Sequence, residues 1–545
     1  MTQKSWAVLA AFLTLTWLVL GGAAVLSDGL YVGKHEGDTL HVIQIVLRMA
    51  QGQLPHLDFM TPIGMLAFWP IAMLVKAGLG VGTAFLWTQV LVAAVFLPMV
   101  IRIAGSRLTL WLAALFGFIV LVLLLALVHG ESEQSISISM HYNRLAWAAA
   151  FVAILAAMIP PEPSQFSRRA GAIDGVIIGL MVFVMAMTKM TYFATFIIPI
   201  AVALGLTGQR RALGVALVTG LVLALGVTLC TGVDFWTAYL SDLLAVAGSE
   251  VRPAPGAPLS AIMAAPAYLA GSLAAVAGVI FLRLSHARAG GMVLLMLLPG
   301  FIYVTYQNFG NDPQWLLLLG VLLLALRGQA DNVISRWGWS YRDGLVLASA
   351  VAFALSSASL FNLMSSPLRH LRVDPVDYVP MLPRGGVHHD LLGHAARQER
   401  ADARIALDIE LDLLPRFEGR DPDTVFLGEA LRFCRLELGL AAVMETITRD
   451  IEQAGLAQGA SVFPADILSS YWLFGELEPL DQGAPWYYGG LPGIEDADYL
   501  LVPACPIIES AREMILELIE ERIEAGTLTV SEVRRTPLYT LFALD

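Results

Sequence analysis

Charged residues are scarce in this chain, and their scarcity excludes an ordinary soluble protein. Only 14% of its 545 residues are charged, whereas 57% are hydrophobic, and the mean hydropathy is +0.70. A typical soluble domain is about a quarter charged. The sequence also contains no nucleophile elbow, phosphate-binding loop or zinc-ligand spacing, so none of these motifs assigns a chemistry.

Lysine is absent from residues 363–545, which hold 31 acidic residues and 15 arginines, a net charge of −16. Residues 1–362 hold 14 acidic and 18 basic residues, a net charge of +4. Such a division predicts a hydrophobic membrane body followed by an acidic, water-soluble domain. The strong negative charge argues against nucleic-acid partners.

Long apolar segments fill the first part of the chain. A membrane-spanning helix needs about 20 mostly apolar residues. The sequence predicts eleven spans, near residues 6–26, 83–104, 108–128, 144–159, 172–188, 191–206, 212–230, 259–282, 291–306, 314–326 and 344–362. The predicted fold class is therefore a polytopic all-α membrane protein with a C-terminal extracytoplasmic α/β domain.

The segment 62–79 decides the topology, because it is apolar but contains Pro62, Pro70 and Lys76. If it does not cross, most loop arginines fall on the side of the N-terminus, as the positive-inside rule requires of the cytoplasm. If it crosses, these arginines fall outside. We therefore predict a surface helix at 62–79, a cytoplasmic N-terminus and an extracytoplasmic C-terminal domain, in a bacterial inner membrane.

Two points remain open in the sequence. The first apolar segment precedes small residues, so it could be a cleaved signal peptide, although its full length favours an uncleaved anchor. Cys230 is interpreted as a small buried apolar residue. Cys434 and Cys505 both fall in the soluble part, where an oxidising compartment permits a disulfide without requiring one.

The loop 27–61 after the first predicted span is dense in ionisable residues. Within it, residues 38–51 have helical periodicity, with a polar stripe of His41, Gln44, Arg48 and Gln51 opposite an apolar stripe. Such a helix is expected to lie in the membrane interface.

This loop resembles the first external loop of GT-C fold glycosyltransferases. The resemblance rests on Glu36-Gly37-Asp38, on the run from Ala50 to Phe59 that contains Gly52, Pro55 and Asp58, and on Thr61-Pro62-Ile63-Gly64. The group includes protein O-mannosyltransferases, oligosaccharyltransferases and aminoarabinose transferases. The chain lacks the Asp-Glu pair of the first and the WWD-type motif of the second.

The resemblance implies transfer of a sugar from a polyprenyl-phosphate or polyprenyl-diphosphate carrier, with Asp38 in the position of the catalytic acidic residue. Capping of the helix 39–51 is the structural alternative for Asp38. Asp58 fits a substrate contact or a turn before Pro62. The acceptor would be a glycan, a lipid or a protein.

Two later positions, Lys189 and Arg144, complete the predicted donor site. Lys189 lies between two apolar stretches, where an ionisable group is costly and usually has a functional role. The resemblance implies that it contacts the donor phosphate. Snorkelling into lipid headgroups is the alternative. Arg144 could likewise bind donor phosphate or anchor to lipid. The predicted substrate contacts are His41, Asp58, His141 and Asn143.

A second acidic cluster, Glu131-Ser132-Glu133, lies in the next external loop. Oligosaccharyltransferase-like members hold a divalent metal with such a pair and the first-loop acidic residue. By this resemblance Asp38, Glu131 and Glu133 could bind Mg²⁺ or Mn²⁺. A solvated loop is the alternative.

The second part of the chain is predicted as a linker-like segment, 363–420, and a small α/β domain, 421–545. Short strands are expected at 424–428 and 499–503, helices at 429–440 and 508–525, and a terminal strand pair at 527–533 and 537–543. The preferred function is a GT-C-type membrane glycosyltransferase. The alternatives are a lipid or solute transporter, or a scaffold that displays the C-terminal domain.

Overall fold

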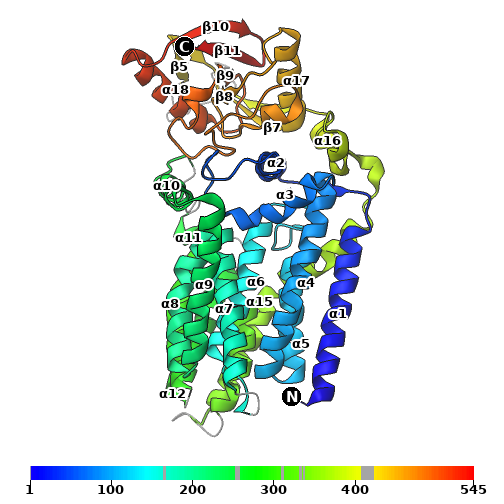
Figure 1. The fold of residues 1–545 in the computed structure, drawn as a ribbon, viewed down its shortest axis with the longest axis vertical. Helices are drawn as coiled ribbons and strands as arrows, with labels where there is room; N and C mark the ends of the chain where they lie inside the picture. Colours follow the sequence, from blue (N-terminus) through cyan, green and yellow to red (C-terminus); the bar gives the residue numbers. More distant parts are fainter. Residues whose placement is uncertain are drawn as a thin grey trace, which may run out of the picture.

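The computed structural model describes residues 2–163, 167–251, 258–285, 287–307, 312–330, 334, 338–406 and 423–545. Figure 1 shows a column of long helices with an α/β domain at one end and the N-terminus at the other. We call these the domain end and the basic end of the bundle. The chain is a multi-span membrane protein, mostly helical, with a C-terminal α/β region.

Each predicted span coincides with a helix of the bundle. Seven described helices are long and apolar enough to cross a membrane: α1 (Gln3–Val25), α4 (Val81–Arg107), α7 (Arg168–Thr188), α9 (Arg210–Thr231), α12 (Pro266–Leu284), α13 (Arg288–Gln307) and α15 (Tyr341–His370). The shorter bundle helices are α5 (Leu110–Leu125), α6 (His141–Met158), α8 (Met190–Leu206) and α14 (Trp315–Leu326). A short α11 (Leu259–Ala264) precedes α12.

The basic end takes its name from the arginines at the helix ends there. They include Arg107 at the end of α4, Arg168 and Arg169 at the start of α7, and Arg210 and Arg211 at the start of α9. Two loop arginines used in the topology prediction, Arg252 and Arg336, lie outside the described residues.

Small residues bring α7 and α9 into close contact. A side-chain carbon at Gly175 would lie 2.7 Å from the Ala212 carbonyl oxygen, and one at Gly179 would lie 2.5 Å from that of Ala216. Close backbone approach through small residues is typical of helices in lipid. Most other α9 side chains face outward, including Cys230, which is exposed and not buried as predicted.

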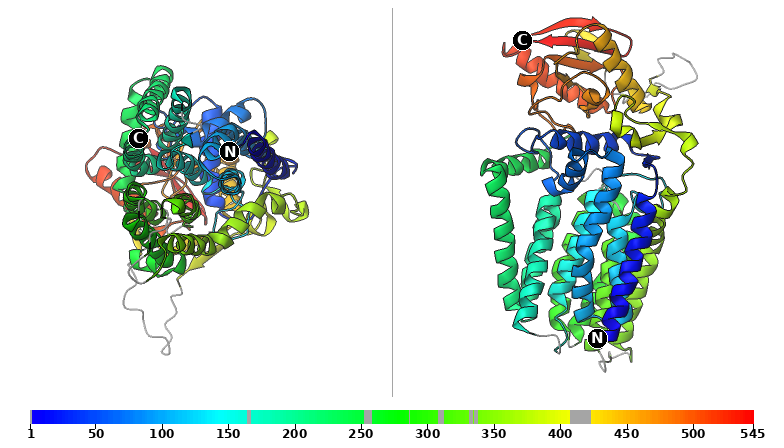
Figure 2. Two further views of the ribbon diagram at one scale, coloured as in Figure 1. Left: turned by 90° about the horizontal axis from the view of Figure 1, so that it is seen from below. Right: turned by 45° about the vertical axis from the view of Figure 1, so that its right-hand side comes forward.

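A layer of short helices separates the bundle from the C-terminal domain. It contains α2 (Glu36–Ala50), η1 (Met65–Ala67), α3 (Trp69–Lys76) and α10 (Asp234–Ala247), as Figures 1 and 2 show. Helix α3 has eight residues, about 12 Å at the helical rise, too short to span a bilayer. The segment 62–79 is therefore a turn and a short helix within this layer.

Helix α2 differs from the amphipathic interfacial helix that the sequence suggested. Three members of its polar stripe, His41, Gln44 and Arg48, are buried. Gln44 Nε2 donates to Pro485 O at 2.6 Å, and Arg48 Nη2 donates to Leu480 O at 2.9 Å. The polar stripe thus faces the C-terminal domain. The prediction failed because a polar stripe has the same periodicity whether it faces water or a polar protein surface.

The C-terminal region contains a four-stranded sheet in the order β10-β11-β9-β8. Its strands are β8 (Val462–Pro464), β9 (Tyr499–Pro503), β10 (Val530–Arg535) and β11 (Tyr539–Leu544), and its long helices are α17 (Leu440–Gln453) and α18 (Glu509–Glu524). Two strand pairs accompany it: β5 (Thr424–Phe426) with β6 (Glu429–Leu431), and β4 (Asp402–Ile405) with β7 (Cys434–Leu438).

The predicted helix at 429–440 is wrong, because β6 and β7 occupy this segment. Hairpin pairing of β6 with β5 and a Cys434–Cys505 disulfide, with Cα atoms 4.6 Å apart, hold it extended. Neither the hairpin pairing nor the disulfide can be predicted from the periodicity of the segment itself. The segment 363–420, expected as linker-like, also has structure: the last turns of α15, then β2 (Tyr378–Pro380), β3 (Leu391–His394), α16 (Ala395–Gln398) and β4.

A three-stranded sheet ties this segment to the first loop of the chain. Strand β1 (Leu30–Val32) pairs in parallel with β3, which pairs antiparallel with β2. Residues about 360 positions apart therefore share one sheet, and the first loop is anchored on the N-terminal side of α2.

Candidate active site

Lys189 occupies the break between α7 and α8, at the domain end of the bundle. Its backbone is extended, with φ −153° and ψ 106°, so the two helices do not merge. The Lys189 ammonium donates to Asn143 Oδ1 at 2.9 Å and lies 5.5 Å from the centre of the Tyr142 ring. Asn143 and Tyr142 therefore help to orient this cation.

Arg144, one position further along α6, is fully buried at 1% exposure. Its guanidinium donates to the carbonyl oxygens of Val128 and Ala126, the latter at 2.9 Å. Among the described residues no carboxylate forms an ion pair with it. Arg144 therefore holds the end of α5 against α6, and its burial removes it from the lipid surface.

A small cavity of about 20 Å³ lies beside Arg144, room for about one water molecule. Three buried polar atoms on its lining residues have no hydrogen-bond partner in the described part of the chain: Arg144 Nε, Tyr192 Oη and Gln314 Oε1. Buried polar atoms are nearly always hydrogen-bonded, so an unpaired set indicates a place for water or a ligand oxygen.

Asp312 also lines this cavity, in the segment that precedes α14. It accepts a hydrogen bond from Ser359 of α15. Burial raises its pKa to about 6. Residues 308–311, which precede Asp312, lie outside the described residues.

Asp38 lies in the first turn of α2, half-exposed. The helix begins at Glu36, after His35 in the left-handed conformation with φ 64°, so Asp38 does not cap it. Asp38 Oδ2 is 3.9 Å from His35 Nδ1, and the His35 ring stacks on His129 with centroids 5.0 Å apart. His129 lines the cavity, so two imidazoles connect Asp38 to it.

Burial lowers the pKa of His35, and the neighbouring His129 lowers it further. His35 is thus neutral at physiological pH. A neutral imidazole beside a carboxylate can accept or donate a proton without adding a fixed charge.

Three of the four predicted substrate contacts interact with residues outside the cavity. His41 lies against Trp486 of the C-terminal domain, with ring centroids 5.2 Å apart. Asp58 Oδ2 accepts the Leu54 amide at 2.6 Å, which closes a turn. His141 lies 3.1 Å from the Ala67 carbonyl oxygen. Of the predicted contacts, only Asn143 lines the cavity.

The carboxylates proposed for a metal do not converge. Glu133 forms an ion pair with Lys34 at 2.6 Å, and this bond lowers the pKa of Glu133 to about 2. Glu131 is exposed. No group of three potential metal-ligating side chains occurs in the part of the chain that the structure describes. The arrangement of Asp38, Glu131 and Glu133 therefore does not fit a shared divalent cation.

Sequence reasoning missed the roles of His35, His129, Tyr192 and Gln314. His35 could have been suspected from its place three residues before Asp38. The others lie in three segments far apart in the chain, and only the packing of α6, α8 and α14 brings them together. Their local sequence carries no signal.

Comparisons with known proteins find two solved structures that resemble this chain. No family model and no curated protein matches the chain. ArnT from Cupriavidus metallidurans in the apo state is 13% identical, with a TM-score of 0.37, over 100% of this chain and 98% of that one. The same protein bound to undecaprenyl phosphate is 13% identical, with a TM-score of 0.35, over 99% of this chain and 98% of that one.

Because such low similarity does not transfer a function, the function of this chain must follow from its own residues. Those residues define a class: a multi-span membrane protein with a carboxylate, two imidazoles and two cations gathered where the bundle meets an extramembrane domain.

Proposed function

We propose that this protein is a GT-C-type glycosyltransferase, which moves a sugar from a polyprenyl-(di)phosphate carrier to an acceptor on the extracytoplasmic face of a bacterial inner membrane. The observation that carries the proposal is that two charged groups connect to the lining of one polar cavity at the domain end. Asp38 connects to it through His35 and His129, and Lys189 through Asn143. The motif resemblance of the first loop supports the same class.

Two independent features support the proposed orientation. Arginines concentrate at the basic end, which the positive-inside rule assigns to the cytoplasm. The Cys434–Cys505 disulfide lies beyond the opposite end, and disulfides persist in oxidising compartments outside the cytoplasm. Both features favour an extracytoplasmic position for Asp38 and for the cavity near it, which we call the Asp38 cavity.

The proposed chemistry needs two charges of opposite sign. As the acceptor oxygen bonds to the anomeric carbon, the bond from that carbon to the carrier phosphate breaks. Asp38 takes the acceptor's proton, and Lys189 stabilises the negative charge that develops on the phosphate. Arg144 adds positive potential from its buried position. The isoprenoid tail remains in the bilayer, since the cavity lies at the ends of the spanning helices.

Binding of a polyprenyl phosphate to the purified protein tests the donor site. Lys189→Gln removes the ammonium charge but keeps a hydrogen-bonding side chain. We expect binding about tenfold weaker or more, the value of a hydrogen bond to a charged group. Lys76→Gln at the end of α3 is the matched control, because Lys76 is exposed at the same end. Equal affinities of the two variants would contradict the donor-site assignment.

A further inference from the structure

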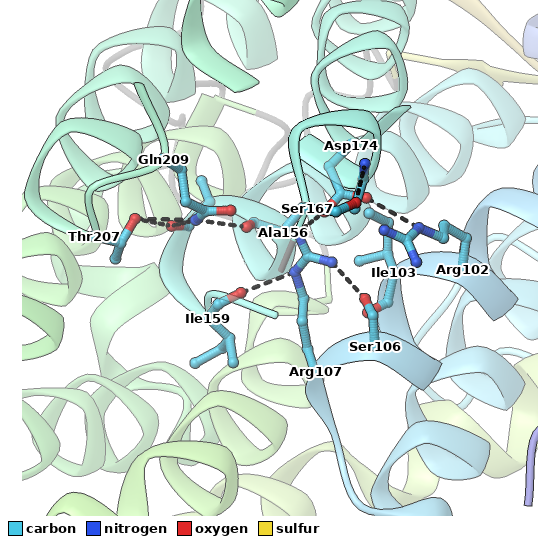
Figure 3. Close-up of polar contacts among 12 residues, drawn as sticks. Arg102, Ile103, Ser106, Arg107, Ala156, Ile159, Ser167, Asp174, Thr207 and Gln209 are labelled. Atoms are coloured by element: carbon cyan, nitrogen blue, oxygen red, sulfur yellow. Dashed lines mark hydrogen bonds and ion pairs between the residues drawn. The ribbon is translucent and has the colours of Figure 1, made fainter. Parts of the chain in front are cut away.

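A second and larger cavity opens at the basic end, on the far side of the bundle from Asp38. It measures about 550 Å³ and lies between the first turns of α7 and α9, with Arg168 and Arg211 on its walls. It has no part in the proposed transfer reaction. Figure 3 shows the polar contacts of three residues that line it, Ser167, Asp174 and Gln209.

The two wall arginines have no competing partner among the residues that the structure describes. Arg168 is the first residue of α7 and Arg211 the second of α9, and both are exposed. Within the described ranges neither forms a hydrogen bond or an ion pair. The stem of Arg211 runs beside Gly171, where an added side-chain carbon would lie 3.9 Å from Arg211 Cβ and Cδ. The guanidinium groups are therefore available to an anion.

The one acidic residue at the base of the cavity is already neutralised. Asp174 accepts from Arg107 Nη2 at 2.7 Å and from Arg102 Nε at 3.2 Å. Figure 3 shows both arginines reaching this carboxylate from α4. Asp174 therefore does not repel an anion from the cavity, and the region keeps a net positive charge.

The edge of the cavity is fixed by backbone contacts. Gln209 Nε2 donates to the carbonyl oxygens of Ala156 and Ala157, at 3.2 and 3.0 Å. Ser167 Oγ accepts the Ala170 amide at 3.0 Å and caps α7. The starts of α7 and α9 are thus held in place, and both direct positive helix ends toward the cavity.

Helix α9, which forms one wall of the cavity, has an apolar outer surface. In α9 only Ala212 and Ala216 are buried, while Leu217 and Leu221 are 62% and 61% exposed. Arg211 and Ala212 of the same helix line the cavity. The helix that carries one of the two arginines therefore also carries an apolar surface suited to lipid chains.

We propose that this cavity binds the phosphate of an anionic phospholipid headgroup, in the leaflet at the basic end, between Arg168 and Arg211. Arginine binds phosphate with two parallel hydrogen bonds, which lysine cannot provide. Basic pockets between spanning helices on the cytoplasmic side are a recognised mode of binding anionic lipids. The inference stands whether or not the protein transfers sugars.

The test uses the full-length protein in a neutral detergent, titrated with phosphatidylglycerol and followed by native mass spectrometry. We compare Arg168→Gln/Arg211→Gln with Arg169→Gln/Arg210→Gln. Both double variants remove the same charge from adjacent, exposed positions, but only the first pair lines the cavity. The first should bind phosphatidylglycerol about tenfold more weakly or worse, and the second within about twofold of wild type.

Three results would overturn the proposal: no binding to the wild-type protein, an equal loss in both double variants, or displacement of the lipid by millimolar inorganic phosphate. The second would indicate diffuse attraction, and the third a site for free phosphate. If the first double variant is unstable, Arg168→Lys/Arg211→Lys keeps the charge but not the paired hydrogen bonds. It should still bind more weakly than wild type, and unchanged binding would contradict the arrangement.

Discussion

Asp38 and Glu36 are two residues apart in α2 and have different partners. Glu36 is buried and forms an ion pair with Arg397 of α16. Asp38 is half-exposed, and among the described residues its ionisable neighbour is His35 at 3.9 Å. Glu36 therefore attaches α2 to α16, whereas the Asp38 carboxylate remains accessible to solvent. A substitution of Glu36 would therefore disturb the fold and is not a suitable control for a substitution of Asp38.

His35 should make the folded protein sensitive to acid. Burial lowers its pKa below the ordinary value of 6.5, so the unfolded chain binds a proton that the folded chain rejects. Stability from this residue is present above about pH 6.5 and is lost as the pH falls below it. Asp38 and Glu36 oppose the shift, while Lys34 and His129 add to it.

The variant His35→Asn tests this, because asparagine tolerates the left-handed backbone that His35 adopts. Thermal unfolding in detergent should show a smaller loss of midpoint between about pH 7.5 and about pH 5 in the variant than in wild type. An equal loss in both proteins would contradict a neutral, buried His35.

Part of the candidate site could be predicted from single residues. Lys189 stood out because a lysine between two apolar stretches is costly, and Asn143 and Arg144 because they begin a span. The structure joins Lys189 to Asn143. His129 and Gln314 could not be found, since their relation to Asp38 depends on how loops from separate helices pack.

At the scale of helices, α4 and α7 are joined by a buried ion-pair cluster at the basic end. Arg107, whose side chain is 0% exposed, bonds Asp174 at 2.7 Å, Ser106 Oγ at 2.6 Å and the Ile159 carbonyl at 2.8 Å. Figure 3 shows that these bonds join the ends of α4 and α6 to the first turns of α7.

Asp174→Ala should destabilise the protein by about 3–5 kcal/mol, because it leaves the Arg107 charge buried and unpaired. Asp343→Ala is the control, since Asp343 is exposed at the same end of the bundle; it should change stability by less than about 0.5 kcal/mol. Thermal unfolding midpoints measure both. Similar midpoints would mean that the cluster does not hold the helices together.

Helix positions were the part of the fold that the sequence predicted well. Spanning helices need about 20 apolar residues, so each leaves a long, local signal. The strands at 429–438 left none, because a hairpin partner and a disulfide determine them. The partner of α2 was also unpredictable, since the carbonyl groups that accept hydrogen bonds from Gln44 and Arg48 lie more than 400 residues later in the chain.

At the scale of the whole molecule, the account requires the two ends of the bundle to face opposite compartments. Single cysteines at Arg169 and Asp377 report on the basic and domain ends, since both positions are exposed. With Cys230 replaced by alanine and Cys434–Cys505 in a disulfide, no other thiol remains. In spheroplasts, an impermeant maleimide should label Asp377→Cys at once and Arg169→Cys only after permeabilisation.

Labelling of both cysteines in intact spheroplasts, or of Arg169→Cys alone, would contradict the orientation. The second result would place the Asp38 cavity in the cytoplasm, where the proposed extracytoplasmic transfer could not occur.

The central claim is that Asp38 is the base of a sugar transfer, and its direct measurement is the product yield of Asp38→Asn. In a strain that lacks the gene, wild type, Asp38→Asn and Asp28→Asn are compared by mass spectrometry of extracytoplasmic glycans and glycolipids. Asp28 is an exposed carboxylate in the same loop. The account predicts about 100-fold less product or lower for Asp38→Asn at normal protein levels, the typical contribution of a positioned acid–base group, and an unchanged yield for Asp28→Asn. Full product yield from Asp38→Asn would contradict the account and favour a transporter or a scaffold.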